Sequence, residues 1–350
     1  MPVMNVPVGI YLAGVPAYLL TVIFAWLLTG WIRCYALNND ILDHPNHRSL
    51  HIRPTPRGGG LTIALLVLVT LFLLRLTSLV SPVFFIALGP AALLVTVTGW
   101  IDDRRGLPAH WRGLTYLLSA VWVTLWITGV SQLIDYSRLV YMVIAAGGIM
   151  WLINLYNFMD GSDGLAGSQA VITAGAGAWI LLLAGEQGMA ILLIVVSASA
   201  TGFLIWNWPP ARIFMGDAGS CLVGLVFGVV ALASDVSNSV PFAVWLVLLS
   251  IFIGDTTMTL IKRIVTGETW YLAHRQHAYQ RLVQMGMSHK QLTCAAISVN
   301  LLILVPAAFM VNTYQVYAWW ITGGVYLLNG SLWLLVQIKY NNYKDGNRAG

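Results

Sequence analysis

The stretch NLYNFMDGSDGLAG, residues 154–167, places carboxylates and amides between two long apolar segments. Its polar residues recur at every third position: Asn154, Asn157, Asp160 and Asp163. At helical or 3₁₀ pitch, such a row projects to roughly one side of the chain. Oxygen ligands of this kind suit a hard cation, and Mg²⁺ typically takes one or two carboxylates together with substrate phosphates. A simpler alternative is that Asp160 or Asp163 caps the helix that follows.

A pair of adjacent aspartates, Asp102 and Asp103, directly follows an apolar segment in GWIDDRRGLPAHWR, residues 99–112. Neighbouring like charges repel, so the pair is costly unless a cation or a proton accompanies it. The pattern therefore indicates a catalytic or cation-binding role. The alternative is a solvated helix end that is neutralised by Arg104 and Arg105.

Another aspartate stands near the end of NWPPARIFMGDAGS, residues 207–220. Two prolines interrupt the preceding helix, and Asp217 then comes just before the next apolar segment. Its carboxylate either caps that helix or belongs to a ligand site, since helix N-termini favour phosphate groups. Asn207, at the start of the stretch, is a further candidate for substrate binding.

Basic residues cluster in HRQHAYQRL, residues 274–282. His274, His277 and Arg281 have the spacing of one helical face, and Arg275 adds to the cationic surface. One alternative is a zinc site that also draws on histidines of residues 44–51, but no second pair has firm zinc-ligand spacing. Another is an amphipathic surface helix without chemistry.

The last candidate is the basic loop DHPNHRSLHIRPTPRGGGL, residues 43–61. Arg48 and Arg57 precede three consecutive glycines, which would let the backbone approach a phosphate. The alternative is a loop held to anionic lipid headgroups by its charge. We treat both arginines as candidate substrate-binding residues.

The elements that must position these residues are membrane-spanning helices. The chain of 350 residues is 58% hydrophobic and only 9% charged, whereas soluble domains are about a quarter charged. Its three cysteines form no CxxC pair, which argues against a disulfide framework or a thiolate metal site. At roughly 20 apolar residues per span, we predict an all-α bundle of about eleven (10–11) spans in one domain, residues 1–350. The expected spans are 8–32, 60–80, 83–101, 113–131, 139–158, 165–184, 189–206, 219–234, 241–261, 292–312 and 315–337.

The distribution of basic residues predicts the orientation. If the spans alternate, all but two of the 18 Lys and Arg residues fall in loops on one side, which the positive-inside rule makes cytoplasmic. The N-terminus is then outside, and residues 338–350 form a cytoplasmic tail. Because topology accounts for the net charge of +5, nucleic-acid binding is not indicated. The polar stretches gather on the cytoplasmic face, which favours Mg²⁺-dependent chemistry on a polyphosphate substrate. Asp255 lies inside a span, where an ionisable residue is a functional candidate.

These motifs, in this order, resemble those of the polyprenyl-phosphate N-acetylhexosamine-1-phosphate transferases. The resemblance covers residues 43–282 and is carried by PNHRSLHIRPTPRGGG, DDRRGL, NLYNFMDGSDGLAG, FMGDAGS and HRQHAYQRL. The last motif is closer to the branch that initiates O-antigen or related surface glycans than to the peptidoglycan-precursor branch, whose triple-histidine run it lacks. Ser162 departs from the aliphatic residue that is usual in the family's DGxDG turn.

The resemblance implies a reaction and a place for it. A UDP-N-acetylhexosamine would donate sugar-1-phosphate to undecaprenyl phosphate or a related polyprenyl phosphate at the cytoplasmic face of a bacterial inner membrane, releasing UMP. It would start the synthesis of O-antigen, lipopolysaccharide or another cell-envelope glycan. Mg²⁺, or Mn²⁺ in its place, would be the cofactor. The resemblance leaves open the hexosamine (GlcNAc, GalNAc, FucNAc or QuiNAc) and whether the protein is a homodimer.

The resemblance also implies roles for individual residues. Asp217 and Asn157 would hold the metal ion on the donor diphosphate. Asp102 and Asp103 would position or deprotonate the acceptor phosphate, and Asp160 would act near them. The remaining residues would bind the donor: Asp163 at the uracil, Phe214 stacked on it, and His274, Arg275 and His277 at the phosphates. Asp255, in a pair similar to a DT pair of the family, and Arg281 are second-tier candidates.

A secondary transporter of an anionic or phosphorylated solute is the alternative class. It predicts inverted repeats and charged residues near the middle of the membrane. The sequence shows no clear internal repeat, and Asp255 is the one acidic residue placed deep in a predicted span. A flippase or assembly partner without enzymatic activity does not explain the density of carboxylates on one face. The residues therefore favour the transferase.

Overall fold

The computed structural model describes residues 8–45, 50, 53–129, 136–269 and 274–349. Arg48 and two histidines of the same loop, His47 and His51, lie outside these residues, so their predicted roles stay predictions. Most of the described chain is helical, as its apolar composition requires, because a helix satisfies its own backbone hydrogen bonds within lipid. The helices in chain order are α1 (Val8–Asn38), α2 (Leu61–Leu76), α3 (Pro82–Arg105), α4 (Ala109–Thr128), α5 (Tyr136–Phe158), α6 (Leu165–Leu183), α7 (Gln187–Asn207), α8 (Asp217–Val236), α9 (Phe242–Leu248), α10 (Ser250–Val265), α11 (Ala278–Gln284), α12 (His289–Val299), α13 (Val305–Thr313) and α14 (Ala318–Ala349).

Each predicted span coincides with one helix or with consecutive helices. Among the described residues, eight helices are long and apolar enough to cross a membrane, and the bent pair α9–α10 would make nine. The protein is thus an all-α, multi-pass membrane protein. The count of about eleven spans and the orientation of the termini stay predictions, partly because α2 is only 16 residues long.

Three local features differ from straight predicted spans. The segment 241–261 is broken at Leu249, where α9 and α10 meet at a bend of 77°. The segment 292–312 contains a π-helical stretch, η2 (Asn300–Leu304), between α12 and α13. A short 3₁₀ helix, η3 (Gln315–Tyr317), precedes α14, which continues as helix to Ala349 through the residues expected to form a tail.

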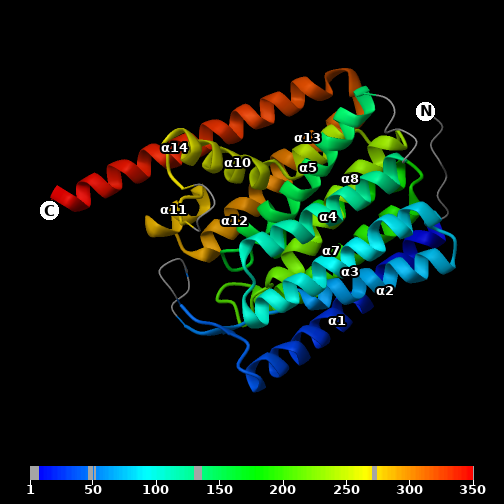
Figure 1. Ribbon diagram of the computed structural model, residues 1–350, viewed down its shortest axis with the longest axis horizontal. Helices are drawn as coiled ribbons and strands as arrows, with labels where there is room; N and C mark the ends of the chain where they lie inside the picture. Colours follow the sequence, from blue (N-terminus) through cyan, green and yellow to red (C-terminus); the bar gives the residue numbers. More distant parts are fainter. Residues whose placement is uncertain (1–7, 46–49, 51–52, 130–135, 270–273, 350) are drawn as a thin grey trace.

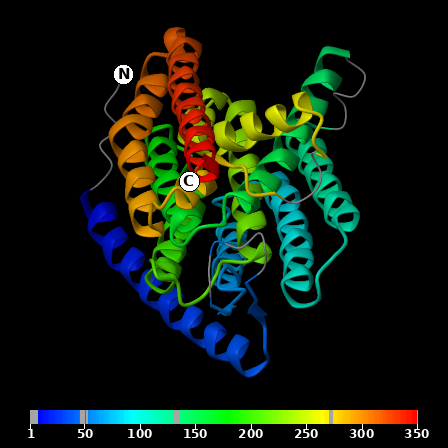
Figure 2. The same cartoon turned by 90° about the vertical axis from the view of Figure 1, so that its left-hand side faces the viewer.

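The buried centre of the bundle is α8, which is surrounded by other helices (Figures 1 and 2). It packs against α3 and α5, while α1, α6 and α7 pack together beside it. In its most apolar window 83% of the residues are buried, compared with 17% in α1 and α14. Helix α14 runs along the outside, and its C-terminal end extends beyond the bundle (Figure 1). The polar N-terminus of α8 is therefore held from several sides.

Two small residues fix where neighbouring helices meet the start of α8. A Cβ atom on Gly99 of α3 would stand 2.4 Å from the backbone nitrogen of Ala218, and one on Gly60 would stand 2.5 Å from the Cα atom of Gly219. Both distances are shorter than any side chain tolerates. The glycines let the end of α3 and the start of α2 approach the first turn of α8 directly.

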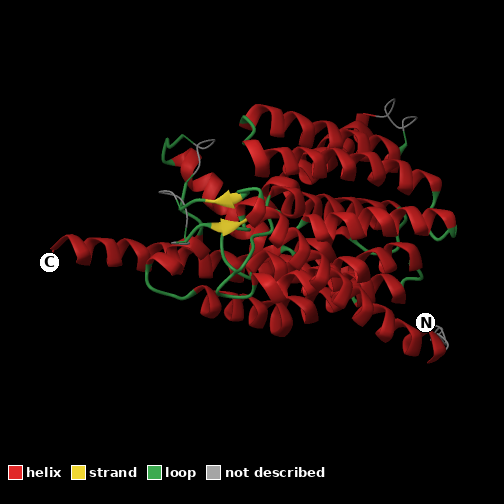
Figure 3. Cartoon of the chain, turned by 90° about the horizontal axis from the view of Figure 1, so that it is seen from below, coloured by secondary structure: helices red, strands yellow, loops and turns green. Residues whose placement is uncertain are grey.

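A two-stranded ribbon organises the loop between α1 and α2. Strands β1 (Leu42–Asp43) and β2 (Thr55–Pro56) pair antiparallel, and Figure 3 shows them among the loops at one end of the bundle. The ribbon is tied to the loop before α8 because Phe214 N donates to Pro56 O at 2.8 Å and Gly59 N donates to Phe214 O at 2.9 Å. The segments carrying the predicted motifs therefore converge at this end.

Candidate active site

A cavity of about 440 Å³ lies at this end of the bundle. Most of the candidate residues line it: Arg57, Asp102, Asn157, Asp160, Asp163, Asn207, Phe214 and Asp217. They come from separate loops and helix ends that are far apart in the sequence. Of the carboxylates that were expected to share one site, Asp102, Asp160, Asp163 and Asp217 line this cavity.

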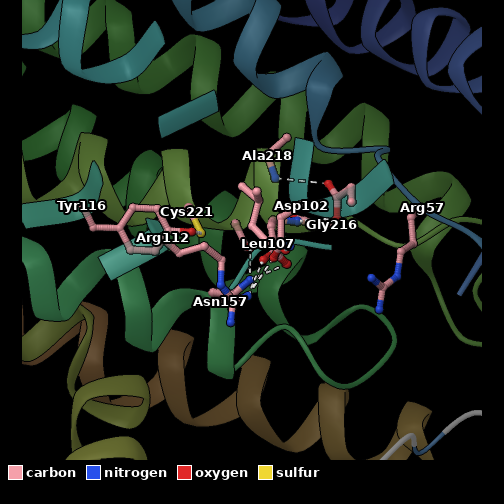
Figure 4. Close-up of polar contacts among 12 residues, drawn as sticks. Arg57, Asp102, Leu107, Arg112, Tyr116, Asn157, Gly216, Ala218 and Cys221 are labelled. Atoms are coloured by element: carbon pink, nitrogen blue, oxygen red, sulfur yellow. Dashed lines mark hydrogen bonds and ion pairs between the residues drawn. The ribbon is translucent and has the colours of Figure 1, made fainter. Parts of the chain in front are cut away.

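At the centre of the site, one arginine joins two carboxylates. Nη1 of Arg112 lies 2.7 Å from Oδ2 of Asp102 (Figure 4) and 3.2 Å from Oδ2 of Asp217. Asp102 also accepts a hydrogen bond from the backbone nitrogen of Leu107, which holds it at the turn between α3 and α4. The side chains of α3 and α8 therefore meet around a single cationic group.

Asn157, in the last turn of α5, connects to the same carboxylate. Its Nδ2 donates to Oδ1 of Asp217 at 2.8 Å and to Oγ of Ser220 at 3.1 Å. Asn154, one turn earlier, instead donates to Met150 O in its own helix. The predicted row of polar residues is thus only partly correct. Helix α5 ends at Phe158, so the loop carries the later members of the row to the cavity.

Asp103 has a different position from its neighbour Asp102. Its oxygens accept hydrogen bonds from the backbone nitrogens of Asp217 at 3.0 Å and Ala218 at 3.3 Å, so it caps α8 from another helix. The residue at the N-cap position, Gly216, has φ +77°, and a Cβ there would lie 2.5 Å from the Asp103 carboxylate. Asp103 does not line the cavity. Because Asp103 caps α8, the Asp217 side chain does not bond the backbone nitrogens of the first turn.

Asp160 adds a third carboxylate on the cavity. The exclusion of water by the surrounding protein raises the pKa of Asp160 well above its ordinary value, and the charges of Asp217 and Asp103 raise it further, while Arg57 opposes them. Gly161 allows the loop to pass close to α11, since a Cβ there would lie 2.2 Å from the Tyr279 hydroxyl. The site thus carries more negative charge than its nearby arginines neutralise.

Arg57 lies at the edge formed by the β-ribbon. It makes an ion pair of 2.8 Å with Asp43. Burial by itself would lower the pKa of Arg57, but the charge and hydrogen bond of Asp43, with smaller contributions from Asp103 and Asp217, outweigh it and raise the pKa. Arg57 therefore stays cationic beside the carboxylates.

The loops of the NLYNFMDGSDGLAG and NWPPARIFMGDAGS motifs are bonded to each other. Asn207 uses both ends of its amide, because Oδ1 accepts from Gly164 N and Nδ2 donates to Ile213 O, each at 2.9 Å. Oδ2 of Asp163 accepts from Ala211 N at 2.9 Å. Asn207 consequently holds two loops in place, and its predicted contact with substrate stays a prediction.

The basic cluster of HRQHAYQRL lies apart from the cavity. His274, Arg275, His277 and Arg281 do not line it, and Asp255 also lies elsewhere. The expected shared helical face is wrong, because α11 begins at Ala278 and His277 is its N-cap residue. The local reason is Asp255, which accepts hydrogen bonds from Ala278 N at 2.7 Å and Tyr279 N at 3.1 Å and so fixes the start of the helix.

Helix α11 nevertheless reaches the site through two other residues. The Tyr279 hydroxyl donates to Phe158 O at 2.9 Å, and Gln280 lines the cavity.

Within the described ranges, no group of three or more His, Cys, Asp or Glu residues is placed to hold a metal ion. The zinc alternative therefore finds no ligand set in this part of the chain.

Several site residues were not predicted from the sequence. Arg112 is in the quoted GWIDDRRGLPAHWR stretch, and the turn at Pro108 that brings it back to Asp102 was its signal. Gln280 lies within HRQHAYQRL but was not among its predicted site residues, and His289, on the next short helix, belongs to none of the quoted motifs. Their position on the cavity depends on how α11 and α12 pack.

The donor set at the centre fits a hard divalent cation. Asp102 and Asp217 present carboxylate oxygens on either side of Arg112, and the amide of Asn157 is hydrogen-bonded to Asp217. Oxygen ligands with one or two carboxylates are what Mg²⁺ selects when substrate phosphates complete its shell. Burial is the main cause of the raised pKa of Asp160, and a second cation beside Arg112 would offset the negative charges that add to it.

Comparison with known proteins identifies the family. The family model "Glycosyl transferase family 4" matches residues 84–235. The decaprenyl-phosphate N-acetylglucosaminephosphotransferase of Mycobacterium leprae (strain TN) is 30% identical over 322 residues, covering 80% of both chains. The chain belongs to the polyprenyl-phosphate N-acetylhexosamine-1-phosphate transferase family. The enzyme of the same name from Mycolicibacterium smegmatis (strain ATCC 700084 / mc(2)155) is 29% identical over 322 residues, covering 80% of this chain and 79% of the relative.

A third relative has a different lipid in its name. The undecaprenyl-phosphate alpha-N-acetylglucosaminyl 1-phosphate transferase of Yersinia pestis is 25% identical over 275 residues, covering 74% of each chain. The transferase described here is thus a multi-pass membrane phosphotransferase, as the motifs predicted. The matched family segment begins in α3 and ends in α8, so it includes the residues that meet at Arg112.

Proposed function

We propose that the protein transfers N-acetylhexosamine-1-phosphate from a UDP-sugar to undecaprenyl phosphate or another polyprenyl phosphate. A phosphate oxygen of the lipid attacks the β-phosphorus of the donor. The bond between that phosphorus and the bridging oxygen breaks, and UMP leaves with the bridging oxygen. The sugar C1–O bond stays intact, so the configuration at C1 is retained.

One observation carries this proposal. Asp102, Asn157, Asp160 and Asp217 come from separate segments and line one cavity with Arg57 and Arg112. Phosphoryl transfer needs little covalent chemistry from the protein, and depends on positioning and on neutralising charge over the phosphate oxygens. A cavity that combines acidic oxygens for a cation with arginines for phosphates supplies both requirements.

Mg²⁺ is the cofactor we propose, with Mn²⁺ as a substitute. Asp217 and Asn157 would hold it, with Asp102 close to the same position because both carboxylates contact Arg112. When bound, the ion supplies positive charge to the donor diphosphate. Arg112 is then available to bind phosphate oxygens with its remaining N–H groups.

Asp102 and Asp160 are the residues that we propose for the acceptor side. Asp102 faces the cavity and is fixed by Arg112 and by Leu107 N, so it can orient the lipid phosphate. Asp160, whose pKa is raised, is suited to holding a proton when substrate phosphates enter. Asp103 acts through the first turn of α8, which it caps, and so positions Asp217.

The setting of the reaction follows from the predicted topology. We propose that the cavity opens to the cytoplasm of a bacterium and that the protein resides in the inner membrane, where UDP-sugars and polyprenyl phosphate meet. Its product would start the synthesis of O-antigen, lipopolysaccharide or another cell-envelope glycan. Relatives named for N-acetylglucosamine make GlcNAc the first sugar to test.

The deciding experiment measures UMP release by the purified protein in detergent. The reaction contains Mg²⁺, undecaprenyl phosphate and one sugar nucleotide from a panel of UDP-GlcNAc, UDP-GalNAc and 6-deoxy analogues. We expect release with at least one UDP-HexNAc, dependence on the lipid and loss of activity with chelator. Absence of lipid-dependent release with every member of the panel would reject the proposed reaction.

A further inference from the structure

The cavity wall at Asp163 contains a histidine that the proposed reaction does not use. His289 is the first residue of α12, and Ser288 caps that helix through Gln291 N, which fixes the position of the histidine. His289 and Asp163 both line the cavity. Nδ1 of His289 lies 3.2 Å from the backbone nitrogen of Asp163 and 3.3 Å from its Oδ1. The ring is therefore held edge-on to Asp163.

The contact at Nδ1 decides which ring nitrogen carries a proton. In the neutral ring, Nδ1 accepts the N–H of Asp163, so the proton is on Nε2. A protonated ring would also have a proton on Nδ1 for Asp163 Oδ1, and Nε2 would keep its own. In both states Nε2 is a hydrogen-bond donor, and no hydrogen bond to another described residue engages it. The site thus presents a donor beside a carboxylate.

Two neighbouring groups make this corner suited to binding a ligand. Ser162, directly before Asp163, is 6% exposed and lines the cavity, and its Oγ has no partner among the described residues. Buried hydroxyls are rarely left unpaired unless a ligand or water bonds them. Phe214 contributes an aromatic side chain to the same cavity, from the loop whose Ala211 N–H holds Asp163.

We propose that His289 is a base-recognition residue of the donor site. Its Nε2–H donates to a carbonyl oxygen of uracil, while Asp163 accepts the adjacent ring N–H. The imide edge of uracil presents a donor next to an acceptor, which matches the acceptor and donor on the protein. A carboxylate offers about four lone-pair positions, so Asp163 keeps its bond to Ala211. This inference rests on the proposed function, which supplies the UDP-sugar.

Binding measurements on the full-length protein test the proposal. Titration calorimetry in detergent with Mg²⁺ present compares two probes, UDP and inorganic diphosphate. The variants are His289→Ala, His289→Gln and His289→Asn, and Lys290→Ala, an exposed neighbour on the same helix, is the control. The Gln side chain places an N–H near the position of Nε2, whereas Asn places its amide near Nδ1.

The expected pattern separates the base from the phosphates. His289→Ala and His289→Asn should weaken UDP binding by about 10-fold, the value of one hydrogen bond to a ligand, and leave diphosphate binding unchanged. His289→Gln and Lys290→Ala should bind both probes as the wild type does. Thermal unfolding of each variant shows whether it is folded.

Other outcomes would overturn the inference. Equal losses for UDP and diphosphate would mean that His289 does not recognise the base. Retention of UDP binding by His289→Asn together with its loss in His289→Gln would make His289 a positioning residue for Asp163 only. Unchanged UDP binding in His289→Ala would exclude any role. A wild-type protein that releases no UMP rejects the proposed function, which is a separate result.

Discussion

Two polar clusters lie on neighbouring elements of the protein, and they balance their charges differently. The cavity cluster consists of Asp102, Asn157, Asp160, Asp217 and Arg112, and two of its carboxylates contact the same guanidinium nitrogen. The anchor cluster surrounds Asp255, between α10 and the start of α11. Both contain buried or partly buried aspartates and both were candidates from the sequence. They differ in what satisfies the carboxylates.

In the anchor cluster, the protein itself supplies the partners. Asp255 accepts from two backbone nitrogens of α11 and from the Thr259 hydroxyl at 3.2 Å, and His277 Nδ1 lies 3.8 Å away. In the cavity cluster, the carboxylates outnumber their cationic partners, and the pKa of Asp160 is raised by burial first and then by the charges of Asp217 and the nearby Asp103. A carboxylate whose lone pairs are bonded by the protein is structural, whereas the incompletely neutralised carboxylates on the cavity are those that we propose to meet a cation or a substrate.

The largest expected effect is on turnover and concerns the cavity cluster. Asp217→Asn keeps the size of the side chain but removes the charge that would hold the metal ion. We expect UMP release to fall by roughly 100-fold or more, the usual cost of losing a charge-stabilising group. Asp235→Asn, at the other end of the same helix, is the matched control and should turn over at a normal rate. Near-normal turnover in Asp217→Asn would refute the assignment.

A second effect concerns the metal ion without reference to activity. Mg²⁺ or Mn²⁺ added to chelator-treated protein should raise the unfolding temperature, because a ligand at 100 times its Kd stabilises the folded state by about 2.7 kcal/mol. Asp102→Asn and Asp217→Asn should lose this shift, and Asp235→Asn should keep it. A shift of the same size in all four proteins would place the cation outside the cavity cluster.

A third effect concerns the anchor cluster and should appear in stability. Asp255→Ala leaves the backbone nitrogens of Ala278 and Tyr279 without their acceptor, which should cost roughly 1–3 kcal/mol. Asp255→Asn keeps one acceptor oxygen and should cost less. Chemical denaturation measures both, and the metal-induced shift should persist in the folded fraction. If Asp255→Asn abolished turnover at full stability, the contrast between the clusters would be wrong.

The smallest effect is a dependence of stability on pH. Burial, together with the charges of His277 and Arg263, lowers the pKa of His274 from 6.5 to about 4. Between about pH 6.5 and pH 4, the unfolded chain therefore binds a proton at His274, whereas the folded protein does not. The free energy of unfolding consequently falls as the pH falls through that range. His274→Gln should flatten this part of the unfolding profile. An unchanged slope would show that His274 titrates normally.

The sequence predicted the helices better than their junctions. Every predicted span coincides with helix, because each long apolar segment must satisfy its backbone within itself. The break at Leu249 and the π-helical stretch at Asn300–Leu304 were not foreseen. Both lie inside apolar segments, and the hydropathy of a segment does not predict where its helix bends. Buried polar groups support them instead, such as Gln169, whose Nε2 donates to Leu248 O at 2.8 Å.

The site was predicted in its residue types and less well in their arrangement. Asp102, Asn157, Asp160 and Asp217 share a cavity as expected. Asp103 has the same charge and the adjacent position, yet it caps α8. Neighbouring residues on a helix point about 100° apart, so only the packing of α3 on α8 decides which of the two faces the cavity. His274 and His277 had suitable spacing but stand before the helix that was expected to align them.

Composition and charge along the chain are enough to predict a multi-pass helical membrane protein with acidic and basic residues in its loops. Hydrophobicity and charge act locally and can be read along the chain. The tertiary structure alone decided that Arg112 joins Asp102 to Asp217, that Asp103 serves a helix end, and that His289 lies against Asp163. Those contacts join residues up to 126 positions apart, and they exist because close packing at small residues brings helix ends to within a few ångströms of one another.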